Sequence, residues 1–211
     1  MKRKSIILTL LLLLNITFGC KKINSEKELN NNSFEKKAEE DKSYFNNLDF
    51  VVSLMKTDED DRPSKFKIRI TRENKTSQDI VYSPGVWPAI NDSINLTRID
   101  YFNSGNEIKE GIENYHDFIV ADFNFDNLKD FAILYDYGGN GGPIYSYFFQ
   151  NKDGKFTEDE KFPLNKGFFP KIMDKTNKRL TIIRPQGCCK TNTTIFQLED
   201  NKWKIVSSVL E

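Results

Sequence analysis

Histidine and cysteine are scarce in this sequence, with one histidine (His116) and three cysteines in 211 residues. A catalytic triad needs a histidine that serves a nucleophile, and nothing around His116 provides that context. The same shortage leaves too few nitrogen and sulfur ligands for a convincing zinc site. Acidic residues are numerous enough to include a glycosidase pair, but the sequence does not place two of them opposite one another. We therefore expect a protein that is not an enzyme.

An excess of positive charge is also missing, because Lys and Arg together number 31, as do Asp and Glu. Nucleic-acid-binding domains usually carry a clustered basic face, so we expect no nucleic-acid partner. The glycine-rich segment at residues 136–143 lacks the Gly-Lys-Ser/Thr that a phosphate-binding P-loop needs. Phosphate binding at that segment is not expected either.

The apolar run at residues 6–14 is too short to cross a bilayer as a permanent helix. Basic residues at positions 2–4 precede it, and Gly19 and Cys20 follow it, which is the order of a lipoprotein signal peptide. In this interpretation residues 1–19 are removed and Cys20 is lipidated. The alternative is an ordinary secretory signal with an incidental cysteine, and either signal exports the chain.

Residues 20–45 are polar and rich in Asn, Lys and Glu, so we interpret them as a flexible linker that holds the domain away from the membrane. Lys21 follows the lipidated position, as in lipoproteins that are sorted onward to an outer membrane, on its periplasmic or its surface face. Removal of residues 1–19 takes away three basic residues and no acidic ones, which leaves a slightly negative chain. Residues 46–211 are long enough for one domain with a core.

The sequence after the linker has the pattern of β-structure. Phe66, Ile68 and Ile70 alternate with charged residues, which predicts a half-buried strand at residues 65–71, in a hairpin with residues 49–55. Further strands are predicted at residues 80–82, 94–101, 117–121, 131–137, 144–149, 169–173, 179–184, 193–198 and 203–209. Short strands in this number, with no convincing helix, indicate an all-β fold.

Two features of this region have structural interpretations. An acidic run at residues 58–61 joins the first two predicted strands, and we expect a solvated hairpin tip there. Trp87 lies in a turn that contains Pro and Gly, and it either completes the core or stands exposed to a partner. Core packing is favoured, because a large aromatic side chain buries much apolar surface.

Residues 122–130, Asp-Phe-Asn-Phe-Asp-Asn-Leu-Lys-Asp, place oxygen donors at short, regular intervals. The predicted ligands of a Ca²⁺ ion are four side chains and one backbone carbonyl, from Asp122, Asn124, Asp126, Leu128 (carbonyl) and Asp130. Three carboxylates this close repel one another unless a cation or a partner neutralises them. Asn127, at the turn position, tolerates positive φ, but Ile133 replaces the glutamate that an EF-hand needs. The alternative is a hairpin whose Asp and Asn residues only make Asx turns.

The run Asp-x-Asn-x-Asp-x-x-x-Asp followed by an apolar strand resembles the calcium loops of FG-GAP repeats, as in the integrin α-subunit propeller. Together with residues 138–145 and 187–189, it is similar to a family of bacterial periplasmic lipoproteins. This resemblance covers residues 78–205 and implies calcium binding and a β-propeller-like fold, with a β-sandwich as the alternative. One branch of that family acts as immunity proteins, which inhibit lysozyme-like peptidoglycan hydrolases delivered by type IV secretion.

Residues 138–143 hold four glycines in six positions, which is costly in conformational entropy. They predict a strained turn beside the calcium loop or a pliable loop that reaches a partner, and the plain turn is favoured. As a hypothesis, this corner docks a partner. Backbone access and exposed aromatic anchors would come from Gly139, Asn140, Gly141, Tyr137 and Tyr145.

Cys188 and Cys189 are adjacent, and with Cys20 lipidated they are the remaining pair for an intramolecular disulfide in an oxidising compartment. Neighbouring α-carbons lie about 3.8 Å apart, so a bridge between them is strained. It would lock a turn but add little stability, because it closes almost no loop. A free buried pair and links to a second subunit are the alternatives.

The sequence therefore predicts a lipid-anchored, calcium-stabilised protein of the cell envelope that inhibits or sequesters an envelope-active protein, such as a secreted peptidoglycan hydrolase. The second hypothesis is a structural or adhesive surface lipoprotein that holds a glycan or another envelope protein. Inhibition of a lysozyme by the purified protein would favour the first hypothesis. Capture by glycans without inhibition would favour the second.

Overall fold

The computed structural model describes residues 43, 45–73, 75–89, 96–104, 108, 116–139, 142–187 and 189–211. The chain divides into two compact units, Met1–Asp41 and Lys42–Glu211, and everything described lies in the second unit. The predicted signal peptide, Cys20 and nearly all of the predicted linker fall outside the described residues. Within those residues, no helix combines the length and the apolar character needed to cross a membrane.

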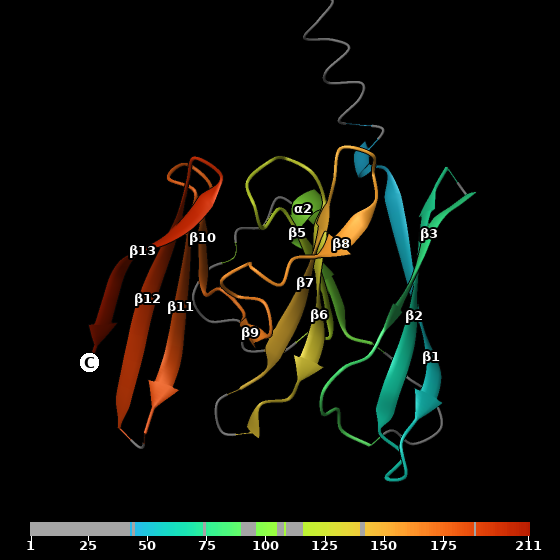
Figure 1. The fold of residues 1–211 in the computed structure, drawn as a ribbon, viewed down its shortest axis with the longest axis horizontal. Coiled ribbons are helices and arrows are strands. Elements are labelled where there is room, and N and C mark those ends of the chain that lie inside the picture. The colour runs from blue at the N-terminus through green and yellow to red at the C-terminus, as the bar shows by residue number, and fades with distance from the viewer. Residues whose placement is uncertain are drawn as a thin grey trace, which may run out of the picture. The chain divides into compact units, whose positions relative to one another are not determined.

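The second unit is all-β, as predicted, and its strands form three sheets (Figure 1). The N-terminal sheet contains β1 (Leu48–Thr57), β2 (Pro63–Arg72) and β3 (Lys75–Tyr82). The central sheet contains β4 (Arg98–Asp100), β5 (Phe118–Ala121), β6 (Asp130–Asp136), β7 (Ile144–Gln150), β8 (Phe156–Glu158) and β9 (Gly167–Phe168), with a short helix, α2 (Tyr101–Ser104), after β4. The C-terminal sheet contains β10 (Ile172–Asp174), β11 (Arg179–Gln186), β12 (Lys190–Glu199) and β13 (Lys202–Leu210).

The three sheets are open, and the described residues form neither a closed barrel nor a propeller. The expected propeller-like arrangement is therefore not confirmed, and the sandwich-like alternative fits the described part of the chain. Strand order within each sheet follows the chain, except that β9 pairs with β7. Neighbouring strands are antiparallel except for β4 and β5, which run parallel.

The hairpin predicted from alternating residues is confirmed. β1 and β2 pair antiparallel, with Phe50 opposite Ile70. Phe66, Ile68 and Ile70 have no exposed surface, because alternate side chains of a strand share one face and this face is turned toward the core. At the tip between the strands, a carboxylate oxygen of Asp58 accepts two backbone N–H groups, so the acidic run forms an exposed turn as expected.

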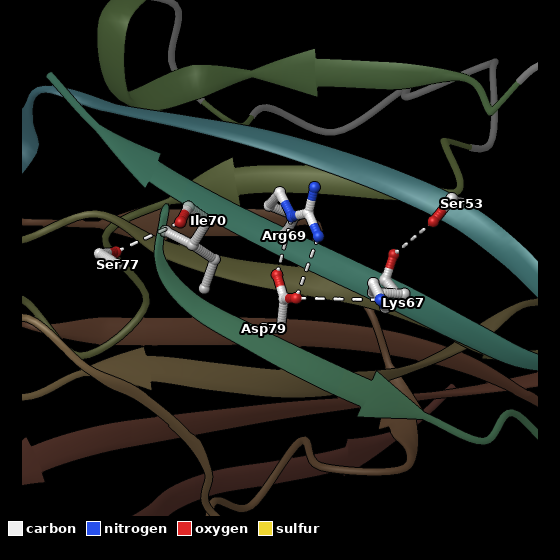
Figure 2. Close-up of polar contacts among 6 residues, drawn as sticks. All are labelled: Ser53, Lys67, Arg69, Ile70, Ser77 and Asp79. Carbon is white, nitrogen blue, oxygen red and sulfur yellow. Dashed lines mark hydrogen bonds and ion pairs between the residues drawn. The ribbon is translucent and has the colours of Figure 1, made fainter. Parts of the chain in front are cut away.

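The outer face of the N-terminal sheet carries charged side chains that pair across strands (Figure 2). Arg69 of β2 donates two hydrogen bonds to Asp79 of β3, from Nε to Oδ1 over 3.0 Å and from Nη2 to Oδ2 over 3.2 Å. Lys67 Nζ lies 3.9 Å from Asp79 Oδ2. Arg69 and Asp79 are directly opposed in the β2–β3 register, so their contact supports that pairing.

Aromatic side chains join the central sheet to the other two, and Figure 1 shows the central sheet between them. Phe50 of β1 packs against rings of the central sheet, with centroid distances of 5.4 Å to Phe118 and 5.5 Å to Phe131. Trp203 of β13 packs against Phe125 at 6.1 Å and Phe162 at 5.5 Å. The core thus runs from one sheet to the next through ring contacts.

Trp87 belongs to this core, as favoured from the sequence: it is buried, and its indole Nε1 donates a hydrogen bond to the carbonyl of Leu134 over 3.0 Å. Two predicted strands differ from the structure. The strand expected at 94–101 is reduced to β4, and residues 91–95 are outside the described part. The strand expected at 169–173 begins only at Ile172, because Pro170 has no N–H to donate to a ladder.

Candidate metal centre

The predicted calcium loop connects β5 to β6 at the edge of the core. Both strands are almost completely buried, and they pair antiparallel up to Ala121 and Asp130. The two phenylalanines of the loop point into the core, where Phe123 packs on Tyr147 at 5.1 Å and Phe125 on Trp203. Because phenylalanine alternates with Asp and Asn in this loop, the phenylalanine rings anchor it to the core.

The loop backbone turns sharply at two positions. Asn127 has a φ of 66°, so the expectation of a residue that tolerates positive φ at this position is confirmed. Phe125 also has a positive φ, of 61°, which is uncommon for a bulky residue and costs conformational energy. Burial of its ring offsets that cost, and nothing in the sequence pattern indicated it.

Asp122 is 3% exposed and organises the turn by accepting two backbone N–H groups. Its Oδ1 accepts from Asp126 over 3.0 Å, and its Oδ2 accepts from Asn127 over 2.9 Å. Burial raises the pKa of Asp122, and the charge of Asp126 raises it further, whereas the two backbone hydrogen bonds and the more distant Lys175 lower it.

Asp130 begins β6 and is fully buried. Its Oδ2 accepts the backbone N–H of Phe123 over 2.9 Å, and its Oδ1 accepts that of Gln150 over 3.0 Å. Burial raises the pKa of Asp130 well above its usual range, and the negative charges of Asp126 and Asp122 also raise it against these hydrogen bonds. The loop therefore concentrates carboxylates that disfavour one another's ionisation.

Asp126 and Asn124 lie nearer the surface and interact with each other. Asn124 Nδ2 donates to Asp126 Oδ2 over 3.1 Å, and the backbone N–H of Asp126 bonds to Asn124 Oδ1 over 3.1 Å. Asp126 Oδ1 in turn accepts the backbone N–H of Leu128 over 2.8 Å. These are the Asx-turn hydrogen bonds of the alternative interpretation, and they are equally compatible with a metal loop because each carboxylate oxygen has a second lone pair.

The donor set fits a hard cation in its chemistry. Three carboxylates, one amide oxygen and one carbonyl come from nine consecutive residues, and in the described structure no lysine or arginine forms an ion pair with any of the three. The described residues nevertheless contain no group of three or more His, Cys, Asp or Glu side chains already gathered as a metal cage. Calcium binding therefore remains a prediction at this loop.

Two supporting residues were not indicated by the sequence. Asn46, just before β1, accepts the N–H of Lys129 over 3.0 Å and donates to the carbonyl of Asn127 over 3.1 Å. Gln150, at the end of β7, donates through its backbone to Asp130 and through Nε2 to the Lys129 carbonyl. Both reach the loop from distant parts of the chain, and no local pattern marks such contacts.

The glycine-rich corner between β6 and β7 is partly described. Gly138, Gly139 and Gly142 have φ values of 68°, 52° and 86°, and the N–H of Gly142 bonds to the carbonyl of Gly139. Asn140 and Gly141, which were expected to contact a partner, lie outside the described residues. The strained turn favoured from the sequence agrees with these angles.

The two tyrosines proposed as exposed anchors differ. Tyr137 is 46% exposed, in agreement with the expectation. Tyr145 is 2% exposed, so the expectation that it is exposed is wrong: both faces of β7 are covered, its ring packs on Phe169 and its hydroxyl donates to the carbonyl of His116.

The disulfide between Cys188 and Cys189 stays a prediction, because Cys188 lies outside the described residues. Cys189 is described and is exposed.

Comparison with known proteins gives one informative likeness. No family model and no curated protein matches the sequence. The fold is similar to that of a Xanthomonas type IV secretion system related protein, with a TM-score of 0.51, 78% of each chain covered and 16% sequence identity. At this identity the likeness concerns the fold alone.

Proposed function

We propose that this chain is a calcium-stabilised binding protein of the cell envelope, held at a membrane by lipid on Cys20, and that it inhibits a peptidoglycan hydrolase. The observation that carries the proposal is the loop at residues 122–130, where two buried carboxylates and a third beside them form no ion pair with a Lys or Arg among the described residues. A surface binding protein needs a rigid scaffold, and a cation at this loop would supply rigidity.

Calcium would be held by the side chains of Asp122, Asn124, Asp126 and Asp130 and by the carbonyl of Leu128. Bound there, the cation supplies positive charge that lets the carboxylates stay ionised together. The chain itself orients them, because backbone N–H groups already hold both oxygens of Asp122 and of Asp130. Modules of calcium-rich compartments bind at about 10⁻⁴–10⁻³ M.

The metal is tested by thermal unfolding with 1 mM calcium and with a chelator. At that concentration we expect calcium to stabilise the fold by about 0.4–1.4 kcal/mol, a rise in Tm of about 1–5 °C. Asp126→Ala should abolish the rise, because this exposed residue is a predicted ligand whose loss removes few other contacts.

Asp60→Ala is the matched control, since it removes an exposed carboxylate from the tip between β1 and β2. It should keep the full calcium response. A wild-type transition that does not move on chelation would show that the loop is not a calcium site.

The inhibitor role is supported by two similarities. The sequence resembles the lipoprotein family that includes immunity proteins, and the fold resembles a type IV secretion system related protein. A partner that arrives by that secretion route would meet an inhibitor in the envelope. A binding surface, rather than a catalytic centre, is then the functional part of the molecule.

The inhibitor role is tested with purified protein and a panel of lysozyme-like hydrolases acting on peptidoglycan. We expect stoichiometric loss of turnover with at least one of them. Capture of the protein on immobilised glycans, with every hydrolase still active, would replace this role with that of a glycan-binding or adhesive lipoprotein.

A further inference from the structure

A groove of about 470 Å³ opens beside the calcium loop, where the central and C-terminal sheets meet. Three carboxylates line it: Asp126 from the loop, Glu158 at the end of β8, and Asp159 directly after it. No basic residue is among the described residues that line it. The volume lies in the range of ligand pockets and exceeds what a single ion would need.

One wall of the groove is aromatic and held in place by ring contacts. Phe162 is buried and packs on Trp203 at 5.5 Å and on Phe149 at 4.9 Å, and all three rings line the groove. Trp203 is only partly buried. A partly exposed indole beside carboxylates offers a cation both an electron-rich ring face and counter-charge.

The carboxylates of the groove keep unused acceptor capacity. Glu158 Oε1 accepts from Asn165 Nδ2 over 3.0 Å and lies 4.0 Å from Lys166 Nζ, while Oε2 has no hydrogen-bond partner among the described residues. Asp159 Oδ1 accepts the backbone N–H of Lys161 over 2.9 Å, and within the same set of residues Oδ2 is likewise without a partner. Two oxygens are thus available to a donor from outside.

We propose that this groove receives a cationic side chain, an arginine or a lysine, from the protein partner. Arginine suits it best, because its planar guanidinium stacks on aromatic rings and donates to two carboxylates at once. Anionic ligands are repelled by Glu158 and Asp159, which are not among the proposed calcium ligands. The hydroxyl groups of a neutral glycan donate hydrogen bonds to carboxylates, but a glycan brings no positive charge to balance them. The inference rests on the proposed binding function and names the chemistry that the partner presents.

The chain contains two tryptophans, so the indole signal of one can report on the groove while the other serves as an internal control. Trp203 lines the groove, whereas Trp87 is buried with its indole N–H bonded to the Leu134 carbonyl. The probe is a short blocked peptide with one central arginine, titrated into ¹⁵N-labelled protein. We expect a saturable shift of the Trp203 indole signal in the millimolar range and none of Trp87. The same peptide with citrulline, which has the shape without the charge, should not bind.

Charge-removing variants locate the contact. The double variant Glu158→Gln with Asp159→Asn should weaken binding of the arginine peptide about tenfold or more, because both acceptors lose their negative charge. Glu160→Gln is the matched control, since this exposed neighbour does not line the groove. It should bind nearly as well as the wild type. Unchanged dispersion of the spectrum reports that each variant is folded.

Three outcomes would overturn the inference. These are equal binding of the citrulline peptide, unaltered affinity in the double variant, and a Trp203 shift with chitotriose but not with the arginine peptide. The last result would identify a glycan groove. The titration is repeated with a chelator to separate the two proposals. Peptide binding without any calcium response would overturn the calcium site alone. A calcium response and hydrolase inhibition without peptide binding would overturn the groove alone.

Discussion

Gly138 and Gly139 are consecutive residues with positive φ, yet their surroundings differ. A Cβ built on Gly138 would lie 1.7 Å from the carbonyl oxygen of Gly142, whereas one on Gly139 would meet nothing within 4 Å. The left-handed conformation penalises a side chain at either position. At Gly138 the close approach of the Gly142 backbone is a second reason, besides the positive φ, why the position needs glycine.

Gly138→Ala should therefore lower the free energy of unfolding by about 2–4 kcal/mol, because backbone strain and steric overlap both act. Gly139→Ala should cost about 1 kcal/mol, from backbone strain alone. Urea unfolding of the two variants measures the difference. Equal losses would mean that the corner relaxes around the added methyl group.

The same corner shows what a sequence pattern can and cannot locate. The density of glycines predicted a strained turn, since few other residues adopt positive φ without cost. The expectation that Tyr145 is exposed rested on its position directly after the glycine-rich corner. β7 is instead covered on both faces, and a continuous aromatic run in such a strand does not reveal which residues face a partner.

At the scale of elements, the alternating pattern in β2 was the most informative, because one face is buried and the other is solvated. The calcium-loop spacing likewise located a turn between two core strands. The parallel pairing of β4 with β5 was not predictable, since Arg98 meets Phe118 across a long connection. The contacts of Asn46 with the loop were not predictable either, because they join residues that are more than 80 positions apart in the sequence.

The outer face of the N-terminal sheet gives a prediction about pH. The hydrogen bonds from Arg69 lower the pKa of Asp79, with smaller contributions from the charges of Arg69 and Lys67. A carboxyl whose pKa is lower in the folded state adds stability above its unfolded pKa of about 3.9, and that contribution is lost as pH falls through the folded pKa.

Arg69→Gln should raise the pKa of Asp79 toward its ordinary value and weaken the dependence of stability on pH in the acid range. Carbon-13 NMR titration of the Asp79 carboxyl measures the shift. Lys67→Gln should raise the pKa less, because Lys67 lies 3.9 Å away and donates no hydrogen bond to Asp79. A larger shift in the lysine variant would contradict this account of the pair.

At the scale of the whole molecule, the proposed lipid anchor would decide where the proposed binding surface operates. We expect the wild-type protein to fractionate with membranes and its N-terminal peptide to carry lipid mass on Cys20. Cys20→Ser should yield a soluble or uncleaved species, because the acylation site is gone. Mass spectrometry of the two N-terminal peptides checks this, and a fully soluble wild-type protein without lipid would rule the anchor out.

The order of the sheets along the chain also determines when each one can be covered as the protein is synthesised. The N-terminal sheet is complete at Tyr82, but Phe50 packs on Phe118, Phe131 and Phe156, which are made later. Because a chain emerges amino end first, the face of the N-terminal sheet that carries Phe50 is formed before the central sheet that covers it. Whether the chain leaves a ribosome or an export channel, the inner face of the N-terminal sheet therefore stays uncovered until β8 has emerged.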